Sequence, residues 1–351
     1  MNDFTPLAAE VRALIASGSP VPDAFFIDLA RAIAEAQGRL GDDPGLAGID
    51  PVPEGAFKLM TVAAFPPSEA EAEFHTSGTT TGSPGRLLVR DLDLYRASAV
   101  AGFERFVAYP PRPARFASLV PPATEKPHSS LSWMASFAAE RFQGALFARS
   151  GPDLDLGALA TALAAWTAAG EPVILFGTTL DFLSLASAFD AGRIAPVALP
   201  AGSRAMHTGG AKGAGREVSR DGLREVLAAR LAIAQEDVVE EYGMTELLSQ
   251  SYDSPRVLPG PRRLVPVRWM RSRVLDPGTL HDVPPGSRGL LCHYDLANVH
   301  TAVAVLTGDI ATAHEDGYSD VIRAPGAAPR GCSWEAAAGA SDVGRRTSGV
   351  K

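Results

Sequence analysis

Apolar residues recur at helical spacing along much of the chain and alternate with short apolar runs of strand length. In residues 5–17 these positions include Leu7, Val11 and Ile15, and residues 22–39 follow the same spacing. We expect further helices at 91–107, 130–142, 154–169, 180–190 and 219–233, and strands near 115–120, 145–148, 172–176 and 237–241. Strands that alternate with helices favour an α/β layered fold with a mostly parallel sheet.

The character of the sequence changes twice along the chain. A stretch rich in Pro and Gly, residues 41–56, follows the first two helices. After about residue 255, Pro, Gly and Arg become frequent, and residues 263–275 and 288–294 have the pattern of β-structure. Residues 332–351 are small and polar, so we expect a poorly ordered tail. The predicted parts are an N-terminal helical segment at 1–56, a core domain at 57–322, and a hinge with a short C-terminal remnant at 323–351.

Composition and charge narrow the classes of partner. The chain has 351 residues, of which 46% are hydrophobic and 21% charged, as in ordinary globular domains. Its formal net charge of −8 argues against a nucleic-acid partner, because a phosphate backbone requires a positive surface.

Neither the N-terminus nor the apolar runs predict export or membrane insertion. The first residues lack the basic and then apolar order of a signal peptide. The longest apolar run, 156–177, is interrupted at 170–172 and predicts a helix followed by a strand, with no membrane span. Two cysteines, Cys292 and Cys332, form no disulfide framework, so we expect a cytoplasmic protein with free thiols.

The most informative local pattern is a loop rich in hydroxyl groups and glycine. Residues 75–86 read His-Thr-Ser-Gly-Thr-Thr-Thr-Gly-Ser-Pro-Gly-Arg. Glycines let backbone N–H groups turn inward, and hydroxyl groups can donate hydrogen bonds to anionic oxygens, so the loop is suited to polyphosphate. No Gly-Lys-Ser or Gly-Lys-Thr follows, which excludes the common phosphate loop. The alternative is a flexible linker.

Three further motifs follow the loop in a fixed order. They are His-Thr-Gly-Gly-Ala-Lys-Gly at 207–213, Tyr-Gly-Met-Thr-Glu at 242–246 and Thr-Gly-Asp at 307–309. Each alone is weak, but the ordered set resembles the adenylate-forming superfamily of acyl-CoA synthetases, adenylation domains and luciferases. The sequences of residues 241–252 and 330–333 are most similar to the LuxE-type acyl-protein synthetase family. The resemblance covers roughly residues 70–333.

The resemblance implies a large adenylate-forming domain of layered mixed β-sheets and helices, a β-rich later part, and a truncated or vestigial C-terminal subdomain. It also implies ATP and Mg²⁺ as cofactors. The nucleotide-binding positions that it implies are Thr76, Ser77, Gly78, Thr79, Thr80, Thr81 and Gly82 in the loop, and Gly209, Gly210, Ala211, Tyr242, Gly243, Asp309 and Arg323 after it.

Within this implied site, each side chain suits its role. Tyr242 offers an aromatic face to adenine, and Asp309 accepts hydrogen bonds from the ribose hydroxyls, which Arg323 also reaches. Thr245 contacts phosphate, and Glu246 is a catalytic residue that binds Mg²⁺ through carboxylate oxygen. Each position has a structural alternative: a buried aromatic at a strand end for Tyr242, an acid at a helix N-terminus for Glu246, and a turn cap for Asp309.

The chain departs from the family pattern in its cations. Family members often close the phosphate loop with a lysine, whereas this chain has Arg86 there and an extra Thr81. In longer relatives a lysine of the C-terminal subdomain reaches the α-phosphate, but Lys351 is the only lysine after Arg323. Either Arg86, Lys212 or His128 supplies the missing charge, or the chain binds ATP and turns over poorly.

The acid site is implied less sharply. Residues 121–131 occupy the place of the family's acyl-substrate loop, and His128 is the candidate wall of the carboxylate pocket, with an exposed loop histidine as the alternative. The next helix carries Trp133, Met134 and Phe137, which line an acyl pocket or belong to the core. The sequence does not distinguish a fatty from an aromatic acid.

The implied reaction has two halves. A carboxylate oxygen of the acid attacks the α-phosphorus of ATP, pyrophosphate leaves, and the acyl group then passes to a thiol, in CoA or in a protein. Cys332, beside Arg330, is a candidate acyl acceptor, with a structural role as the alternative, whereas Cys292 lies in an apolar run and is expected to be inert. Two further alternatives are an acyl- or aryl-CoA ligase and a nucleotide-binding module without catalysis.

Overall fold

The larger sheet of the structure is mixed and carries the central strands of the protein. The computed structural model describes residues 3–76, 84–209 and 220–327. Within them, seven strands pair in the order β12-β11-β10-β9-β8-β4-β5, with parallel pairing from β10 to β5 and antiparallel pairing of β11 and β12. The strands are β4 (Arg115–Ser118), β5 (Leu146–Phe147), β8 (Val173–Thr178), β9 (Arg204–Thr208), β10 (Val238–Tyr242), β11 (Ser251–Tyr252) and β12 (Val265–Pro266).

Helices flank this sheet, and side-chain caps define where several of them begin. The helices are α4 (Leu92–Phe106), α5 (Ser130–Ala139), α6 (Leu156–Ala168), α7 (Thr179–Asp190) and α8 (Arg220–Leu231). Asp91, Ser129 and Asp155 accept hydrogen bonds from backbone N–H groups of the first turns of α4, α5 and α6. Thr178 and Asp181 form a capping box at α7, which directs the chain from β8 into the helix.

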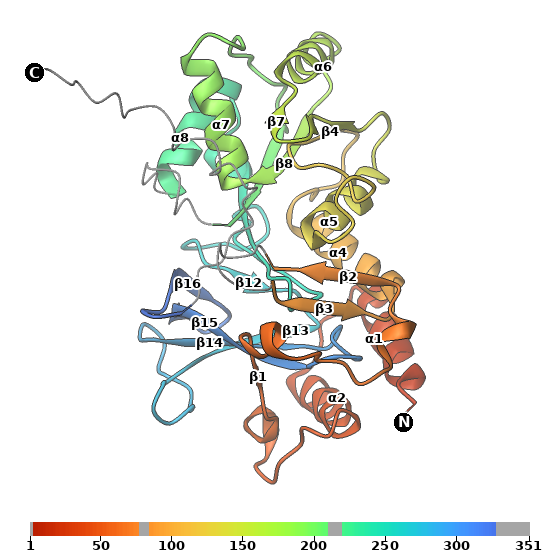
Figure 1. Cartoon of the computed structure of the whole chain (residues 1–351). Coiled ribbons are helices and arrows are strands. Elements are labelled where there is room, and N and C mark those ends of the chain that lie inside the picture. Colours follow the sequence, from red (N-terminus) through yellow and green to blue (C-terminus); the bar gives the residue numbers. More distant parts are fainter. Residues whose placement is uncertain (1–2, 77–83, 210–219, 328–351) are drawn as a thin grey trace, which may run out of the picture.

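The second sheet belongs to the later part of the chain and lies below the first in Figure 1. Its order is β1-β15-β14-β13, and β16 pairs with β15. The strands are β1 (Val52–Pro53), β13 (Met270–Leu275), β14 (Arg288–Asp295), β15 (Ala304–Ala313) and β16 (Tyr318–Arg323). A hairpin of β2 (Ala72–His75) and β3 (Arg86–Val89) stands apart from both sheets, as do β6 (Arg149–Ser150) and β7 (Asp153–Leu154). The predicted β-rich later part is therefore confirmed.

The N-terminal segment packs into the same core as the rest of the chain. Helices α1 (Thr5–Ser17) and α2 (Asp23–Ala36) bury their apolar faces in a cluster that includes residues of β14 and β15. Strand β1 pairs in parallel with β15, and the short helix α3 (Ala56–Leu59) follows it. Short 3₁₀ turns lie at Gly45–Gly48, Pro67–Glu69 and Gln235–Asp237. The predicted boundaries at residues 56 and 322 stay predictions.

The predicted α/β layered fold is confirmed. The seven expected helices of the described chain are present to within three residues at either end, and the four expected strands are present. The sequence pattern did not predict β9, whose last two residues fall in the motif at 207–213, or the β2–β3 hairpin. No helix in the described parts of the chain has the length and hydropathy needed to cross a membrane. Most of the predicted C-terminal remnant, residues 328–351, lies outside the described residues.

Candidate active site

Three residues from distant motifs meet between the two sheets. Tyr242 ends β10, Asp309 lies in β15, and Arg323 ends β16 opposite Asp309 in register. The Tyr242 hydroxyl donates a hydrogen bond of 2.7 Å to Asp309 Oδ2, and Arg323 Nη1 donates one of 3.0 Å to Asp309 Oδ1. Asp309 is buried, with 5% of its surface exposed. A carboxylate oxygen has two lone pairs, so Asp309 can still accept from ribose hydroxyls while it holds these partners.

The structure adds Glu54 to this cluster. Arg323 Nη1 donates a hydrogen bond of 3.1 Å to Glu54 Oε2, and its Nη2 also contacts this carboxylate. Glu54 reaches the site because β1 pairs with β15, and its backbone N–H donates to Leu306 O at 2.9 Å. A Cβ on Gly308 would lie 2.9 Å from Glu54 Oε1, so a side chain at this position would require the Glu54 carboxylate to move. No sequence motif marks Glu54, which lies in the stretch rich in Pro and Gly at 41–56.

The expected adenine side of the site lies at the carboxyl ends of two parallel strands. Thr208 in β9 pairs with Glu241 in β10, which places Gly209 next to Tyr242. Ligands of open α/β sheets bind at such strand ends. Gly209 has a φ of +77°, and its carbonyl accepts a hydrogen bond of 2.5 Å from the Thr179 hydroxyl. Gly210 and Ala211, together with the candidate cation Lys212, lie outside the described residues.

The Tyr242 ring is held by aromatic neighbours of the second sheet. Its centroid lies 5.4 Å from that of His293 and 5.7 Å from that of Tyr318, which it meets edge-to-face. Tyr242 stands at a strand end, as its structural alternative predicts, but it is half-buried and its hydroxyl is bonded to Asp309.

The turn after β10 carries the remaining motif residues. The Thr245 hydroxyl lies 3.4 Å from the His75 carbonyl, which brings this turn to the end of β2. Glu246 is buried at 3% exposure, and its carbonyl accepts a hydrogen bond of 2.9 Å from Asn298 Nδ2. A Cβ on Gly243 would lie 2.4 Å from Glu241 Oε1, so a side chain there would require the Glu241 carboxylate to move. The described residues contain no group of three His, Cys, Asp or Glu side chains placed to hold a metal.

The hydroxyl-rich loop connects the two strands of the β2–β3 hairpin. Its base is closed by Thr76 and Gly85: the Thr76 N–H donates to Gly85 O at 2.9 Å, and the Gly85 N–H donates to Thr76 Oγ1 at 2.7 Å. We call Thr76 and Gly85 the loop base. The predicted phosphate ligands Ser77, Gly78, Thr79, Thr80, Thr81 and Gly82 lie outside the described residues.

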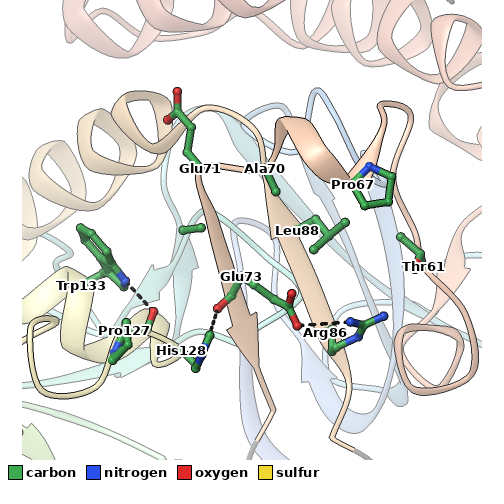
Figure 2. Close-up of a pocket in the computed structure, with 11 residues that line it drawn as sticks. Thr61, Pro67, Ala70, Glu71, Glu73, Arg86, Leu88, Pro127, His128 and Trp133 are labelled. Carbon is green, nitrogen blue, oxygen red and sulfur yellow. Dashed lines mark hydrogen bonds and ion pairs between the residues drawn. The ribbon is translucent and has the colours of Figure 1, made fainter.

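A cavity of about 480 Å³ lies on the outer face of the hairpin. Figure 2 shows Glu73 and Arg86 on its strands and His128 and Trp133 on the opposite wall. His128 is exposed, its ring stacks on that of His75 with centroids 4.3 Å apart, and its Nδ1 lies 2.9 Å from Glu73 O. The position of His128 in the lining of this cavity is therefore compatible with its predicted place at the wall of a pocket.

The charge of Arg86 is partly compensated in this cavity. Arg86 Nη1 lies 3.4 Å from Glu73 Oε1, and Figure 2 shows both side chains on the same face of the hairpin. Burial acts to raise the pKa of Glu73, but the hydrogen bond with His75 and the charge of Arg86 outweigh it, so this pKa is lowered. Glu73 therefore stays anionic beside Arg86 at neutral pH.

Two of the candidate pocket residues belong to the core. Met134 and Phe137 are buried at 2% and 5% exposure in the main hydrophobic cluster, whereas Trp133 lines the cavity. Cys292 is also core: it is fully buried in β14, and burial raises the pKa of its thiol to about 12. This agrees with its expected inertness. Cys332, the candidate acyl acceptor, lies outside the described residues.

Comparison with solved structures finds enzymes of the adenylate-forming type. A 2-hydroxyisobutyryl-CoA ligase in the postadenylation state, in complex with 2-HIB-AMP, is 15% identical with a TM-score of 0.62 over 86% of this chain and 66% of that one. The open conformation of this ligase with 2-HIB-AMP and CoA is 17% identical with a TM-score of 0.51, over 78% of this chain and 59% of that one. ATP-bound MatB from Rhodopseudomonas palustris is 17% identical with a TM-score of 0.51, over 75% of this chain and 49% of that one.

These likenesses establish the fold. The chain spans less than two thirds of the length of each of these enzymes. No curated protein matches the sequence significantly. The sequence model of the family described as "Acyl-protein synthetase, LuxE" matches residues 42–333. Because this match covers most of the chain and includes all four motifs, the chain belongs to the LuxE acyl-protein synthetase family.

Proposed function

We propose that this protein uses ATP to activate a carboxylic acid as an acyl-adenylate, with release of pyrophosphate, and then transfers the acyl group to a thiol. The observation that carries the proposal is the convergence of Tyr242, Asp309 and Arg323 at the carboxyl end of β10. Family membership and the fold shared with adenylate-forming ligases support it. An enzyme that consumes ATP in this way would work in the cytoplasm.

The residues present suit ATP as substrate and Mg²⁺ as cofactor. Asp309 would hold the ribose, and the hydroxyl-rich loop, entered through Thr76, would hold the polyphosphate. Mg²⁺ is commonly bound by one or two carboxylates plus substrate phosphates and water, so the single carboxylate of Glu246 is a sufficient protein ligand. When bound, Mg²⁺ would neutralise charge on the phosphates.

The protein need not provide a nucleophile for the first half-reaction. A carboxylate oxygen of the acid forms a bond to the α-phosphorus of ATP, while the bond from this phosphorus to the oxygen that bridges to the β-phosphorus breaks, and pyrophosphate carries that electron pair away. The contribution of the chain is position and charge: Thr245 and the loop donate hydrogen bonds to phosphate, and Asp309 fixes the nucleoside.

The acid would enter from the cavity beside the hairpin. Its volume of about 480 Å³ accommodates a fatty chain or an aromatic ring, and Trp133 and Leu88 supply apolar walls. His128 and Arg86 are the cationic or polar groups available to the acid carboxylate at the rim. The acceptor would be a thiol in a partner protein, in CoA or, as an enzyme-bound intermediate, in Cys332.

ATP–pyrophosphate exchange tests the first half-reaction. The protein is incubated with ATP, labelled pyrophosphate and a panel of fatty and aromatic acids, and we expect label in ATP only when a suitable acid is present. A folded protein that binds ATP and exchanges with none of the acids would favour a nucleotide-binding module without catalysis.

Labelled acid tests the acceptor. We expect a labelled acyl-enzyme that survives denaturation and is absent in Cys332→Ser. Parent protein that carries no label, but forms labelled acyl-CoA when CoA is added, would assign the chain to the CoA ligases instead.

A further inference from the structure

A second cavity, of about 290 Å³, lies at the amino ends of the parallel strands β9 and β10. Arg204 begins β9 and Asp237 directly precedes β10, and both residues line the cavity. Gly209 and Tyr242, of the candidate nucleotide site, lie at the other ends of the same strands. A strand of this length spans about 16 Å, so the cavity is separate from the nucleotide site.

The lining of this second cavity carries more positive than negative charge. Its charged residues are three arginines, Arg112, Arg204 and Arg256, and one carboxylate, Asp237. Arg256 holds Asp237 in a bidentate pair, with Nε 2.8 Å from Oδ1 and Nη2 2.7 Å from Oδ2, and its Nη2 lies 3.5 Å from Glu236. Because Arg256 already neutralises Asp237, the other two arginines have no matched carboxylate in the lining.

Arg204 is a buried part of the cavity wall that keeps hydrogen-bond donors in reserve. It is 6% exposed, and its Nη1 donates a hydrogen bond of 2.7 Å to Val107 O and also contacts the Tyr109 carbonyl. Among the described residues, no atom accepts a hydrogen bond from its Nε or Nη2, and Asp237 Oδ1 lies 3.8 Å from Nε. Nε and Nη2 form the side of a guanidinium that binds an oxyanion in bidentate fashion. Since buried donors are normally satisfied, this side points to an acceptor supplied by a ligand.

Arg112 adds a second cation without a carboxylate partner. A Cβ built on Gly202, which also lines the cavity, would lie 3.5 Å from Arg112 Nη1. Arg112 is exposed and forms no ion pair with any part of the chain that the structure describes. Burial lowers the pKa of Arg204, and Asp237 opposes this shift. The charges of Arg256 and Arg112 lower the pKa further, so the guanidinium groups repel one another, and an anion between them would offset this repulsion.

We propose that the second cavity binds a small phosphate anion, inorganic phosphate or pyrophosphate, between the guanidinium groups of Arg112 and Arg204. Guanidinium forks match the oxygens of phosphate in bidentate geometry. The volume of about 290 Å³ lies at the lower end of small-molecule sites, which are about 300–1,000 Å³, and therefore suits a small anion better than a whole nucleotide. The proposal goes beyond the proposed function, because it concerns the opposite edge of the sheet.

Calorimetric titration of the full chain with inorganic phosphate, pyrophosphate and acetate tests the proposal. We expect phosphate or pyrophosphate to bind at least about 10-fold more tightly than acetate, and the tighter of the two identifies the ligand. Arg112→Met should raise this Kd about 10-fold, because one charge-assisted contact is lost, and should leave the Kd for ATP within about two-fold of the parent. Asp237→Asn should lower the Kd for the anion by a similar factor, because a competing carboxylate is removed. Arg288→Met, which removes an exposed arginine of β14 in the second sheet, is the control and should bind like the parent.

Several outcomes would overturn the proposal: folded parent that binds neither phosphate nor pyrophosphate, an unchanged Kd in Arg112→Met, or acetate that binds as tightly as the two phosphates. An equal loss of ATP affinity in Arg112→Met would also overturn it, because the anion would then share the nucleotide site. Arg112 is exposed, so its variant keeps the test valid if Asp237→Asn does not fold. A parent that binds phosphate with this dependence on Arg112 but forms no acyl-adenylate would contradict the proposed function and support the second site.

Discussion

At the scale of single residues, Asp309 is the centre of the proposed nucleoside site because Tyr242 and Arg323 both donate to it. We expect Asp309→Ala to raise the Kd for ATP and the Kd for AMP together, by about 10- to 100-fold, since hydrogen bonds to a charged acceptor are lost in both complexes. Calorimetric titration checks this result. Unchanged affinities for both ligands would exclude Asp309 from the site.

A second prediction at this scale concerns Glu241, which is buried beside the Tyr242 motif. Burial raises the pKa of Glu241 to about 7, outweighing the hydrogen bond with Thr208, and the charge of Glu240 adds to the shift. Between pH 4.5 and 7 the folded state therefore binds this proton more tightly than the unfolded chain. The contribution of Glu241 to the free energy of unfolding is complete below pH 4.5. This free energy then falls by roughly 3 kcal/mol as the pH rises to about 7.

Urea denaturation of the parent and of Glu241→Gln at several pH values measures this dependence. The free energy of unfolding of the parent, relative to that of the variant, should fall between pH 4.5 and 7 and then level off. Glu10→Gln, on the exposed face of α1, is the control and should show no such change. Parallel curves for parent and Glu241→Gln would mean that Glu241 titrates normally in the folded protein.

At the scale of elements, Gln37 ties the end of α2 to the turn that supports the catalytic motif. Its side-chain nitrogen donates to the carbonyls of Asn298 and Val299 at 2.9 Å, and its oxygen accepts from the Val303 N–H at 3.0 Å. Asn298 in turn donates to the Glu246 carbonyl. The N-terminal helices are thus connected to the proposed Mg²⁺ ligand through two side chains.

We expect Gln37→Ala to lower the free energy of unfolding by about 1–3 kcal/mol, because three backbone groups lose their partner. Gln143→Ala, at an exposed position before β5, should stay within about 0.5 kcal/mol of the parent. Urea denaturation of both variants gives the comparison. Equal stability of the two variants would show that this connection contributes nothing.

Helical periodicity and short apolar runs allowed the helices and four strands of the first sheet to be predicted from the sequence, since both signals are local. The β2–β3 hairpin was not predicted because its strands have only four residues each, too few for a clear alternating pattern. Tyr242, Asp309 and Arg323 could be predicted through motifs. Glu54 carries no motif, and its contact with Arg323 spans 269 positions in sequence and depends on the pairing of β1 with β15.

At the scale of the whole molecule, the candidate site lies where the two sheets and the hairpin meet. Strand β10 of the first sheet supplies Tyr242, the second sheet supplies Asp309 and Arg323, and the hairpin supplies Thr76. Glu54 comes from the segment that joins the N-terminal helices to the hairpin. Each part therefore contributes one portion of the proposed nucleotide site.

Direct detection of the acyl-adenylate tests the central claim. The parent and Glu246→Ala are incubated with ATP, Mg²⁺ and a panel of fatty and aromatic acids, and acyl-AMP and pyrophosphate are quantified by mass spectrometry. We expect the parent to form both products in equal amounts with at least one acid, and Glu246→Ala to form them at least about 100-fold more slowly. Folded parent protein that binds ATP and forms no acyl-AMP with any acid, or Glu246→Ala that forms it at the parental rate, would contradict the account.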